Sequence, residues 1–168
     1  PFSINDVEID YQRLRTREDQ MDLLLVAAKK EGINDYAQVA REAKLTPIVI
    51  DIDAFTVQNA FEANYGIPDA ETTVLLNIGA SLATLNILSG GTSAFTRDIA
   101  NAGNSITEEI QKQLGVSYEE AEAYKCGDGG MVPREVAGIV ASVVEGMAGE
   151  IQRSLDFYLA TSADREIA

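Results

Sequence analysis

The sequence predicts an α/β fold in two lobes. Stretches in which apolar and polar residues alternate, as in strands, are followed by stretches whose apolar residues recur at helical spacing. Up to Tyr65 the expected order is strand, strand, helix, strand, helix, and a three-stranded meander then precedes three helices. With 168 residues the chain can form two small lobes. Turn-forming residues from 66 to 72 predict the boundary between them.

Two strands are expected at the beginning of the chain. "INDVEIDYQRL" (4–14) alternates apolar and polar residues, which indicates a strand. "MDLLLVAA" (21–28) is more apolar and predicts a more buried strand. The charged residues 15–20 predict a loop between the two.

A helix and a strand–helix pair follow. Apolar residues at helical spacing predict a helix over 31–44, and Pro47 prevents its continuation. "PIVIDIDAF" (47–55) predicts a strand that leads into a second helix. Asp53 is placed to cap that helix, and the stretch 65–68 ends it.

The rest of the chain predicts a small sheet and three helices. Three strands are expected at 72–78, 82–88 and 92–99. A helix over 105–114 is followed by the capping box Ser117-x-x-Glu120, which starts a helix through Lys125. After a Gly-rich loop, one apolar stripe from 136 to 159 predicts a long helix.

Composition excludes several classes of function. The chain has 27 acidic and 13 basic residues, a net charge of −14, which argues against binding nucleic acid or anionic lipid directly. Because Cys126 is the single cysteine and histidine is absent, the chain has no internal disulfide, Ser-His-Asp site or histidine-built zinc site. No apolar run approaches the length of a membrane span, so a cytoplasmic setting is expected.

The turn Gly79-Ala80-Ser81 is the first candidate for binding. It joins two apolar runs and can bring successive backbone N–H groups and a hydroxyl to one point, as a phosphate requires. The alternative is a tight turn and nothing more. Asn77, just before it, can help to hold a hydrated cation or can cap the turn.

Other candidate site residues also have both a functional and a purely structural interpretation. Asp51 and Asp53 can serve a metal or acid–base chemistry, or Asp53 can simply stabilise a helix start. Gln58 is a surface amide or orients a water near a phosphate. "AGNSIT" (102–107) is an ordinary turn or an anion site at a helix N-terminus. Glu122 and Lys125 are most simply an exposed ion pair.

The serial order of these pieces resembles a known family. "TTVLLNIGASLATLNILSGGTSAFTRDIANAGNSITEEIQKQLGVSYEEAEAYK" resembles the second nucleotide-facing lobe of the actin-like ATPases, especially of their FtsA-like branch. With the upstream "LLLVAAKKEGINDYAQVAREAKLTPIVIDIDAFTVQNAFEANYG" the resemblance narrows to the PilM family of type IV pilus assembly. It implies a partial actin-like, ribonuclease-H-like fold in two lobes.

The resemblance also implies a division of the chain. Residues 1–46 resemble the small inserted subdomain of the first lobe. Residues 47–68 resemble a strand–helix connector of that lobe, and residues 69–168 the second lobe with its phosphate hairpin. The first phosphate loop is expected before Pro1 and the adenosine loop after a strand near Ile167, so the chain is expected to be a central fragment.

The same resemblance implies roles for single residues. The residues it places at the second phosphate loop are Asn77, Gly79, Ala80 and Ser81. Gln58 resembles the residue that positions water, and Gly103-Asn104 the small-residue turn of that lobe. Glu122 and Lys125 resemble the "AE..K" helix beside the ribose and adenine. ATP and Mg²⁺ are the implied ligands, and no metal site built from protein ligands alone is expected. Asn77 stands where the family usually has Asp, which removes a charge that would hold magnesium and activate water.

The implied function is that of an adaptor. Such a protein binds ATP as a conformational element rather than as a fast enzyme, at the cytoplasmic face of the inner membrane and without inserting into it. It takes up the N-terminal tail of PilN in a groove expected near strands 7–14 and 21–28, and links the membrane platform to the pilus motor ATPases. Self-association is a further possibility.

Two alternatives stay open at this point. One is an actin-like or sugar-kinase-like phosphotransferase with real turnover, which Asn77 and its apolar surroundings disfavour. The other is a cell-division filament protein of the FtsA type, which sequence beyond Ala168 would distinguish.

Overall fold

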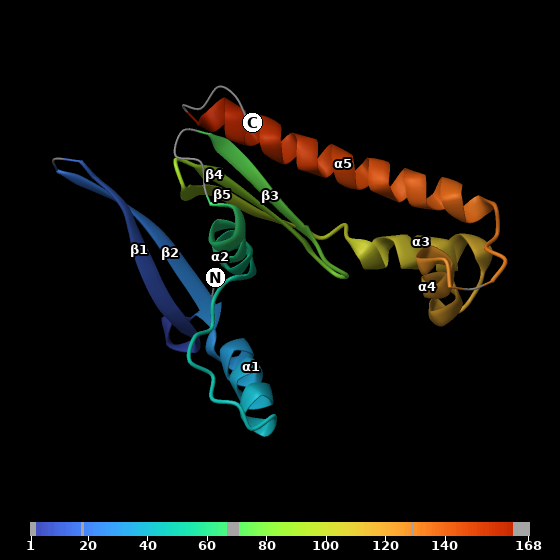
Figure 1. Cartoon of the computed structure of the whole chain (residues 1–168), viewed down its shortest axis with the longest axis horizontal. Coiled ribbons are helices and arrows are strands. Elements are labelled where there is room, and N and C mark those ends of the chain that lie inside the picture. The colour runs from blue at the N-terminus through green and yellow to red at the C-terminus, as the bar shows by residue number, and fades with distance from the viewer. Residues whose placement is uncertain (1–2, 18, 67–70, 129, 163–168) are drawn as a thin grey trace. The chain divides into compact units, whose positions relative to one another are not determined.

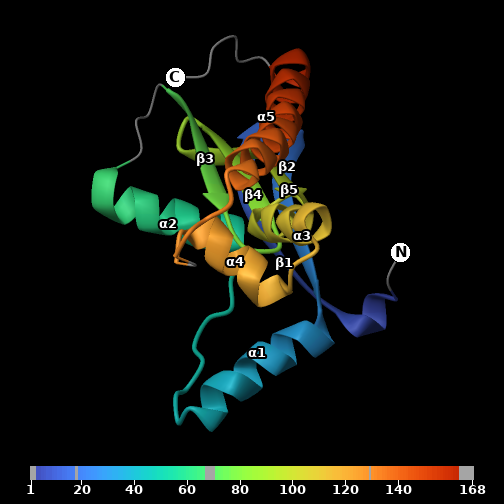
Figure 2. The ribbon, with the colours of Figure 1, turned by 90° about the vertical axis from the view of Figure 1, so that its right-hand side faces the viewer.

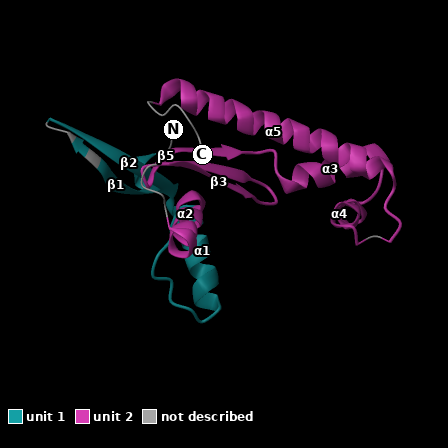
Figure 3. Cartoon of the chain, turned by 45° about the horizontal axis from the view of Figure 1, so that its top comes forward, with its two compact units in different colours: residues 1–52 teal, residues 53–168 magenta. Residues whose placement is uncertain are grey.

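The structure is a computed structural model that describes residues 3–17, 19–66, 71–128 and 130–162. The chain forms two compact units, residues 1–52 and residues 53–168 (Figure 3). The predicted lobe boundary lies mainly on residues 67–70, outside the described residues. The division between the units instead follows Ile52, so the helix that begins at Asp53 belongs to unit 2. The assignment of residues 1–46, 47–68 and 69–168 to parts of two lobes stays a prediction.

Unit 1 is built on one β-hairpin. Its elements are the 3-10 helix η1 (Ile4–Asp6), strands β1 (Val7–Arg17) and β2 (Gln20–Lys29), and helix α1 (Lys30–Glu42) (Figure 1). The two strands pair antiparallel, as their sequence pattern predicts. The predicted loop 15–20 is wrong over residues 15–17, which continue β1 until Arg17 pairs with Gln20. The register shifts at a bulge between Arg13 and Arg15, and the antiparallel pairing resumes beyond it.

The strand expected to be the more buried one, 21–28, is exposed or half-buried throughout. The side chains of Ile9, Tyr11, Leu23 and Leu25 are 44–67% exposed. The register pairs Ile9 with Ala27, Tyr11 with Leu25, and Arg13 with Leu23, so these four residues share one face of the hairpin, called here the apolar hairpin face. A two-stranded sheet has too few neighbours to cover both faces, and α1 packs mainly along β2, with one ion pair from Lys30 to Glu8 of β1.

The segment after α1 is not the strand that its sequence predicts. Between α1 and the helix α2 (Asp53–Tyr65) the chain has no regular structure, and Ile48 and Val49 are 91% and 77% exposed. A strand forms only where its N–H and C=O groups pair with a neighbour. The two sheets of the described residues, β1–β2 and the three-stranded sheet of unit 2, offer this segment no pairing. Asp53 is the first helical residue rather than the residue before it.

Unit 2 contains the predicted meander. Its strands are β3 (Thr72–Ile78), β4 (Ala83–Ser89) and β5 (Thr92–Ile99), antiparallel in the order β3-β4-β5. Helix α2 contacts one face, and the helix α5 (Glu135–Thr161) lies along the other (Figures 1 and 2). Leu85 and Ile87 of β4 pack against Tyr158 of α5. Because both faces are covered, β4 is buried from Ala83 to Leu88.

A helical subdomain completes unit 2. Helix α3 (Gly103–Leu114) starts two residues earlier than predicted, and α4 (Tyr118–Cys126) carries the predicted capping box. In that box Glu120 N–H donates to Ser117 Oγ at 3.2 Å, and Ser117 N–H donates to Glu120 Oε2 at 3.1 Å.

The long helix α5 joins the helical subdomain to the sheet. Val136 and Ile139 pack with Ile110 of α3 and Ala121 of α4, while Tyr158 packs on the sheet. Each fully buried side chain of this size stabilises the fold by about 1.5–3 kcal/mol. The predicted apolar stripe is too wide, because two of its residues, Val144 and Leu159, are exposed on α5.

Candidate nucleotide site

The turn between β3 and β4 is closed by a backbone hydrogen bond. Gly79 N–H donates to Leu82 O at 3.0 Å, and a Cβ on Gly79 would lie 2.8 Å from that oxygen. Ala80 and Ser81 are exposed. Within the described part of the chain, no acceptor bonds the N–H of either residue. The turn therefore presents two N–H donors and the Ser81 hydroxyl to a ligand.

The N-terminus of α3 holds this turn from behind. Gly103 N–H donates to Gly79 O at 3.0 Å, and Asn104 N–H donates to Ala80 O at 2.6 Å. A Cβ on Gly103 would lie 3.2 Å from Gly79 O, so the close approach favours glycine at this position. The anion site considered for residues 102–107 is thus not available at these two N–H groups, because carbonyl oxygens of the turn already occupy them.

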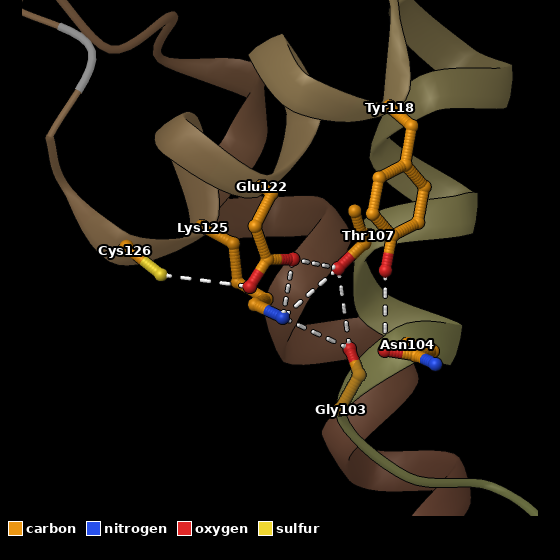
Figure 4. Close-up of polar contacts among 7 residues, drawn as sticks. All are labelled: Gly103, Asn104, Thr107, Tyr118, Glu122, Lys125 and Cys126. Atoms are coloured by element: carbon orange, nitrogen blue, oxygen red, sulfur yellow. Dashed lines mark hydrogen bonds and ion pairs between the residues drawn. The ribbon is translucent and has the colours of Figure 1, made fainter. Parts of the chain in front are cut away.

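Glu122 and Lys125 of α4 form more than a surface ion pair. Lys125 Nζ lies 2.7 Å from Glu122 Oε2, and only 19% of the lysine side chain is exposed. Lys125 Nζ also donates to Thr107 Oγ1 at 2.9 Å and to Gly103 O at 3.3 Å (Figure 4). Thr107 Oγ1 in turn donates to Glu122 Oε2 at 2.5 Å. We call Gly103, Thr107, Glu122 and Lys125 the α3–α4 cluster.

The α3–α4 cluster stabilises the charged form of Glu122. The hydrogen bond from Lys125, and next the one from Thr107, lower the pKa of Glu122 below its ordinary value, while desolvation acts in the opposite direction. Glu122 is accordingly an ionised hydrogen-bond acceptor at neutral pH, with its Oε1 atom 3.7 Å from the sulfur of Cys126. A carboxylate of this kind can accept from the hydroxyl groups of a sugar.

The structure brings most of the predicted site residues together. A continuous chain of hydrogen bonds runs from Gly79 through Gly103 to Lys125 and Glu122, and Asn104 N–H bonds Ala80 O beside it. Ser81 lies in the same turn. The residue Asn104 is bound on both sides, since its side-chain oxygen accepts from Tyr118 Oη at 3.2 Å (Figure 4). Asn77 is exposed on β3, opposite Thr84, two residues before the turn.

Gln58 does not lie in this group. Its Oε1 accepts from Asn86 Nδ2 at 3.3 Å, and its Nε2 is 3.5 Å from Gly91 O, at the end of β4 away from the Gly79–Ser81 turn. Asn86 is 1% exposed and also donates to Ala54 O and accepts from Ser93 Oγ. The amide of Gln58 is thus part of a buried polar network between α2 and the sheet. Its role in positioning water stays a prediction.

Sequence reasoning missed Thr107, which is fully buried at the centre of the α3–α4 cluster. The signal available in the sequence is its place on α3. Thr107 is four residues after Gly103 and next to Ile106, on the side of the helix that Ile110 shows to be buried. A hydroxyl at such a position needs a hydrogen-bond partner. A polar residue on the apolar face of a predicted helix is therefore a signal that identifies Thr107 as a candidate.

A second concave surface of unit 2 is unsuited to phosphates. A shallow groove of about 740 Å³ lies between α3 and α5 and is lined in part by Glu108, Glu109 and Glu150. Lys112 is its single lining cation. Carboxylates repel an anionic ligand, so the turn and the α3–α4 cluster remain the better candidate.

The described residues contain neither a group of three or more Cys, Asp or Glu side chains fit to hold a metal ion nor a helix long and apolar enough to span a membrane. Asp51 and Asp53 thus form no such group among the described side chains.

Comparison with known proteins identifies the family. The family described as "Type IV pilus assembly protein PilM" matches residues 1–168 of the chain. The chain belongs to the PilM family. Among the alternatives that the sequence leaves open, the match favours the PilM family over the cell-division proteins of the FtsA type.

Solved structures agree with this PilM-family membership at the level of the fold. A PilM–PilN type IV pilus biogenesis complex superposes with a TM-score of 0.82 at 23% identity, over 96% of this chain and 48% of that one. MreB 5 of Spiroplasma citri bound to AMPPNP gives a TM-score of 0.58 at 17% identity, over 77% of this chain and 48% of that one. The ethanolamine utilization protein EutJ from Carboxydothermus hydrogenoformans gives 0.50 at 20% identity, over 69% and 38%.

These likenesses show that this PilM-family chain has the actin-like fold. The chain spans about half the length, or less, of the structures that it matches. The predicted α/β actin-like fold is thereby confirmed, as is its partial extent relative to those structures.

Proposed function

We propose that the chain belongs to a nucleotide-binding adaptor of type IV pilus assembly that takes up the N-terminal tail of PilN. The observation that carries this proposal is the family match over all 168 residues. Unit 1 supplies an open apolar surface for a peptide, and unit 2 supplies the turn and the α3–α4 cluster for a nucleotide. Contacts with the pilus motor ATPases and a place at the inner membrane through protein partners belong to the same proposal.

The donor set of unit 2 fits part of an ATP molecule. The N–H groups of Ala80 and Ser81 with the Ser81 hydroxyl suit phosphate oxygens, and ionised Glu122 suits the ribose hydroxyls. The similar MreB structure holds AMPPNP, a nucleotide, in an actin-like fold. ATP carries both kinds of group, phosphates for the turn and a ribose for Glu122. The remaining contacts would come from parts of the actin-like fold that this chain does not span.

Magnesium fits the described residues less well than ATP does. Near the turn, Asn77 offers one neutral amide oxygen, which is a weaker ligand for Mg²⁺ than a carboxylate. The phosphates and water would supply the other ligands. Without a carboxylate at Asn77 the turn has no group to activate water, which favours an adaptor that holds nucleotide over an enzyme that turns it over quickly.

The apolar hairpin face fits a peptide partner. Tyr11 and Leu25 are opposite each other and about two-thirds exposed, so an apolar segment could bury both. The similar solved structure is a complex of PilM with PilN. We therefore place the PilN tail on this face, between residues 7 and 28.

Amide hydrogen exchange on the full-length protein tests the proposal. A saturating peptide of the PilN N-terminal tail is expected to protect residues 7–28, because burial and ordering slow the opening of the hairpin. Unchanged exchange over these residues at saturating peptide contradicts the placement. Protection confined to other parts of the chain would place the peptide there instead and would also contradict the proposal.

Two single substitutions sharpen this test. Leu25→Ser removes an exposed apolar side chain from the proposed face and is expected to weaken the peptide by about tenfold. Gln12→Ser, at an exposed position on the opposite face of the same hairpin, is the matched control and is expected to leave the affinity within about twofold. Equal effects of the two substitutions would contradict a specific face.

A further inference from the structure

Thr107 occupies an unusual position among the side chains of unit 2. It is 0% exposed, yet its hydroxyl contacts both members of an ion pair on another helix. Glu122 Oε2 lies 2.5 Å from Thr107 Oγ1, and Lys125 Nζ lies 2.9 Å from the same oxygen. Figure 4 shows the threonine from α3 pointing toward the two side chains of α4.

The chemistry of a hydroxyl explains why threonine suits this position. One O–H group donates to the carboxylate while its lone pairs accept from the ammonium group, so a single atom fixes both charges. Valine has nearly the same shape but can do neither. Serine keeps the hydroxyl and loses only a methyl group.

The same cluster reaches the phosphate-facing turn through one residue. Gly103 O accepts from Lys125, and Gly103 N–H donates to Gly79 O of the turn. Thr107 Oγ1 lies 3.4 Å from Gly103 O as well. The position of Glu122 and Lys125 is therefore set relative to the turn by the beginning of α3, with Thr107 in contact with both charged groups.

We propose that Thr107 is a positioning residue for nucleotide recognition, which fixes Glu122 and Lys125 at the nucleoside end of the site while the turn holds the phosphates. This inference rests on the proposed nucleotide function of unit 2. Thr107, itself buried, acts on the ligand through Glu122 and Lys125.

ATP affinity of the full-length protein tests the inference by a mutant cycle. Thr107→Val and Glu122→Gln are each expected to weaken ATP about tenfold, the size of effect for losing a hydrogen bond to a charged group. The double variant is expected to bind no worse than the weaker single variant, because both changes remove the same arrangement. The loss of ATP affinity caused by Ser81→Ala is expected to multiply with the loss caused by Thr107→Val. Ser81 lies in the turn and affects the phosphate end of the site instead.

Two control variants separate positioning from folding. Thr107→Ser is expected to restore ATP affinity to within about twofold of the natural protein, since it keeps both hydrogen bonds. Thr56→Val, at an exposed helical threonine whose hydroxyl bonds Asp53 O within α2, is expected to leave affinity unchanged. A merely structural role for Thr107 would lower the melting temperature without producing the non-additive pattern with Glu122→Gln.

The contrary outcomes are distinct from one another. If the natural full-length protein binds ATP and Thr107→Val binds it equally well, the inference is wrong. Multiplying effects of Thr107→Val and Glu122→Gln, or a Thr107→Ser variant as weak as Thr107→Val, would also overturn it. If the natural protein binds no ATP, the proposed nucleotide function itself fails.

Discussion

At the scale of single residues, Glu122 has the clearest electrostatic signature in unit 2. Lys125 and Thr107 both donate hydrogen bonds to its carboxylate, and these bonds lower the pKa of Glu122. Because the folded protein binds the proton less readily than the unfolded chain, these contacts contribute to stability at pH values above the ordinary glutamate pKa of about 4.3. The contribution is lost as the pH falls through the lower pKa of the folded state.

Lys125→Met should therefore raise the pKa of Glu122, because it removes the largest cause of the shift. The measurement is an NMR titration of the side-chain carboxyl carbon of Glu122 in both variants. Lys112→Met is the matched control, since Lys112 pairs with Glu109 in the same subdomain rather than with Glu122. If the pKa of Glu122 is the same in the Lys125→Met variant as in the natural protein, the ion pair is not formed in solution.

Single residues also show what the sequence can predict of the site. Small residues at a turn and a Glu-x-x-Lys spacing are local patterns, which mark Gly79 and Gly103 as candidates and Glu122 with Lys125 as an ion pair. The nucleotide role expected of that pair comes from the family resemblance. Thr107 and Asn86 are polar residues buried by contacts between distant segments, so their role depends on packing that no local pattern contains. The helical position of Gln58 follows from local spacing, whereas the bond of its amide to Asn86 depends on contact between α2 and β4.

At the scale of elements, the β3–β4 turn and the beginning of α3 act as one piece of backbone. Two N–H groups of the helix bond two carbonyl oxygens of the turn, and glycine stands on both sides of one of these bonds, between Gly103 N–H and Gly79 O. The positive end of the helix dipole thus stabilises the turn's carbonyl oxygens. A side chain at Gly103 would push the two segments apart, whereas one at Gly79 would collide with Leu82 O within the turn.

Substitution of two glycines in unit 2 should have opposite effects on stability. Gly79→Ala is expected to lower the free energy of unfolding by about 1–3 kcal/mol, since its Cβ would lie 2.8 Å from Leu82 O. Gly138→Ala, on the exposed side of α5 with open space around it, should raise that free energy by about 0.5–1 kcal/mol. Urea unfolding followed by circular dichroism measures both changes. A stabilising Gly79→Ala would mean that the turn is open in solution.

Elements were predictable where their cause is local. The capping box and the helical spacing of α1 each lie within a few residues, and the structure confirms these elements. Residues 47–52 have the composition of a strand, yet strand formation depends on a neighbour. The described residues place no neighbour beside them. For the same reason the apolar pattern of 21–28 did not reveal that one face of its sheet is uncovered.

At the scale of the whole molecule, negative charge is unevenly distributed. Residues 53–168 contain 17 of the 27 acidic residues but only six of the 13 basic ones. The proposed ligand of this unit is also an anion. Lys125, the cation nearest the turn through Gly103, is bonded to Glu122, so the contacts with phosphate would come mainly from backbone N–H groups.

A net charge of −14 should make the chain more stable in salt. Raising NaCl from about 20 mM to about 300 mM shortens the range of repulsion between carboxylates and is expected to raise the melting temperature by a few degrees. Differential scanning fluorimetry measures the shift. Glu145→Gln should reduce the salt effect and Arg134→Gln should enlarge it, both at exposed positions. A melting temperature that falls with salt would indicate that attractive ion pairs dominate instead.

The position of Cys126 has a practical consequence. It is the single thiol of the chain, it is exposed, and it follows Lys125 at the end of α4 with its sulfur 3.7 Å from Glu122 Oε1. A maleimide dye would therefore attach to this chain at one defined point beside the α3–α4 cluster. Its fluorescence would report the arrival of a ligand at Glu122 directly, without any engineered labelling site.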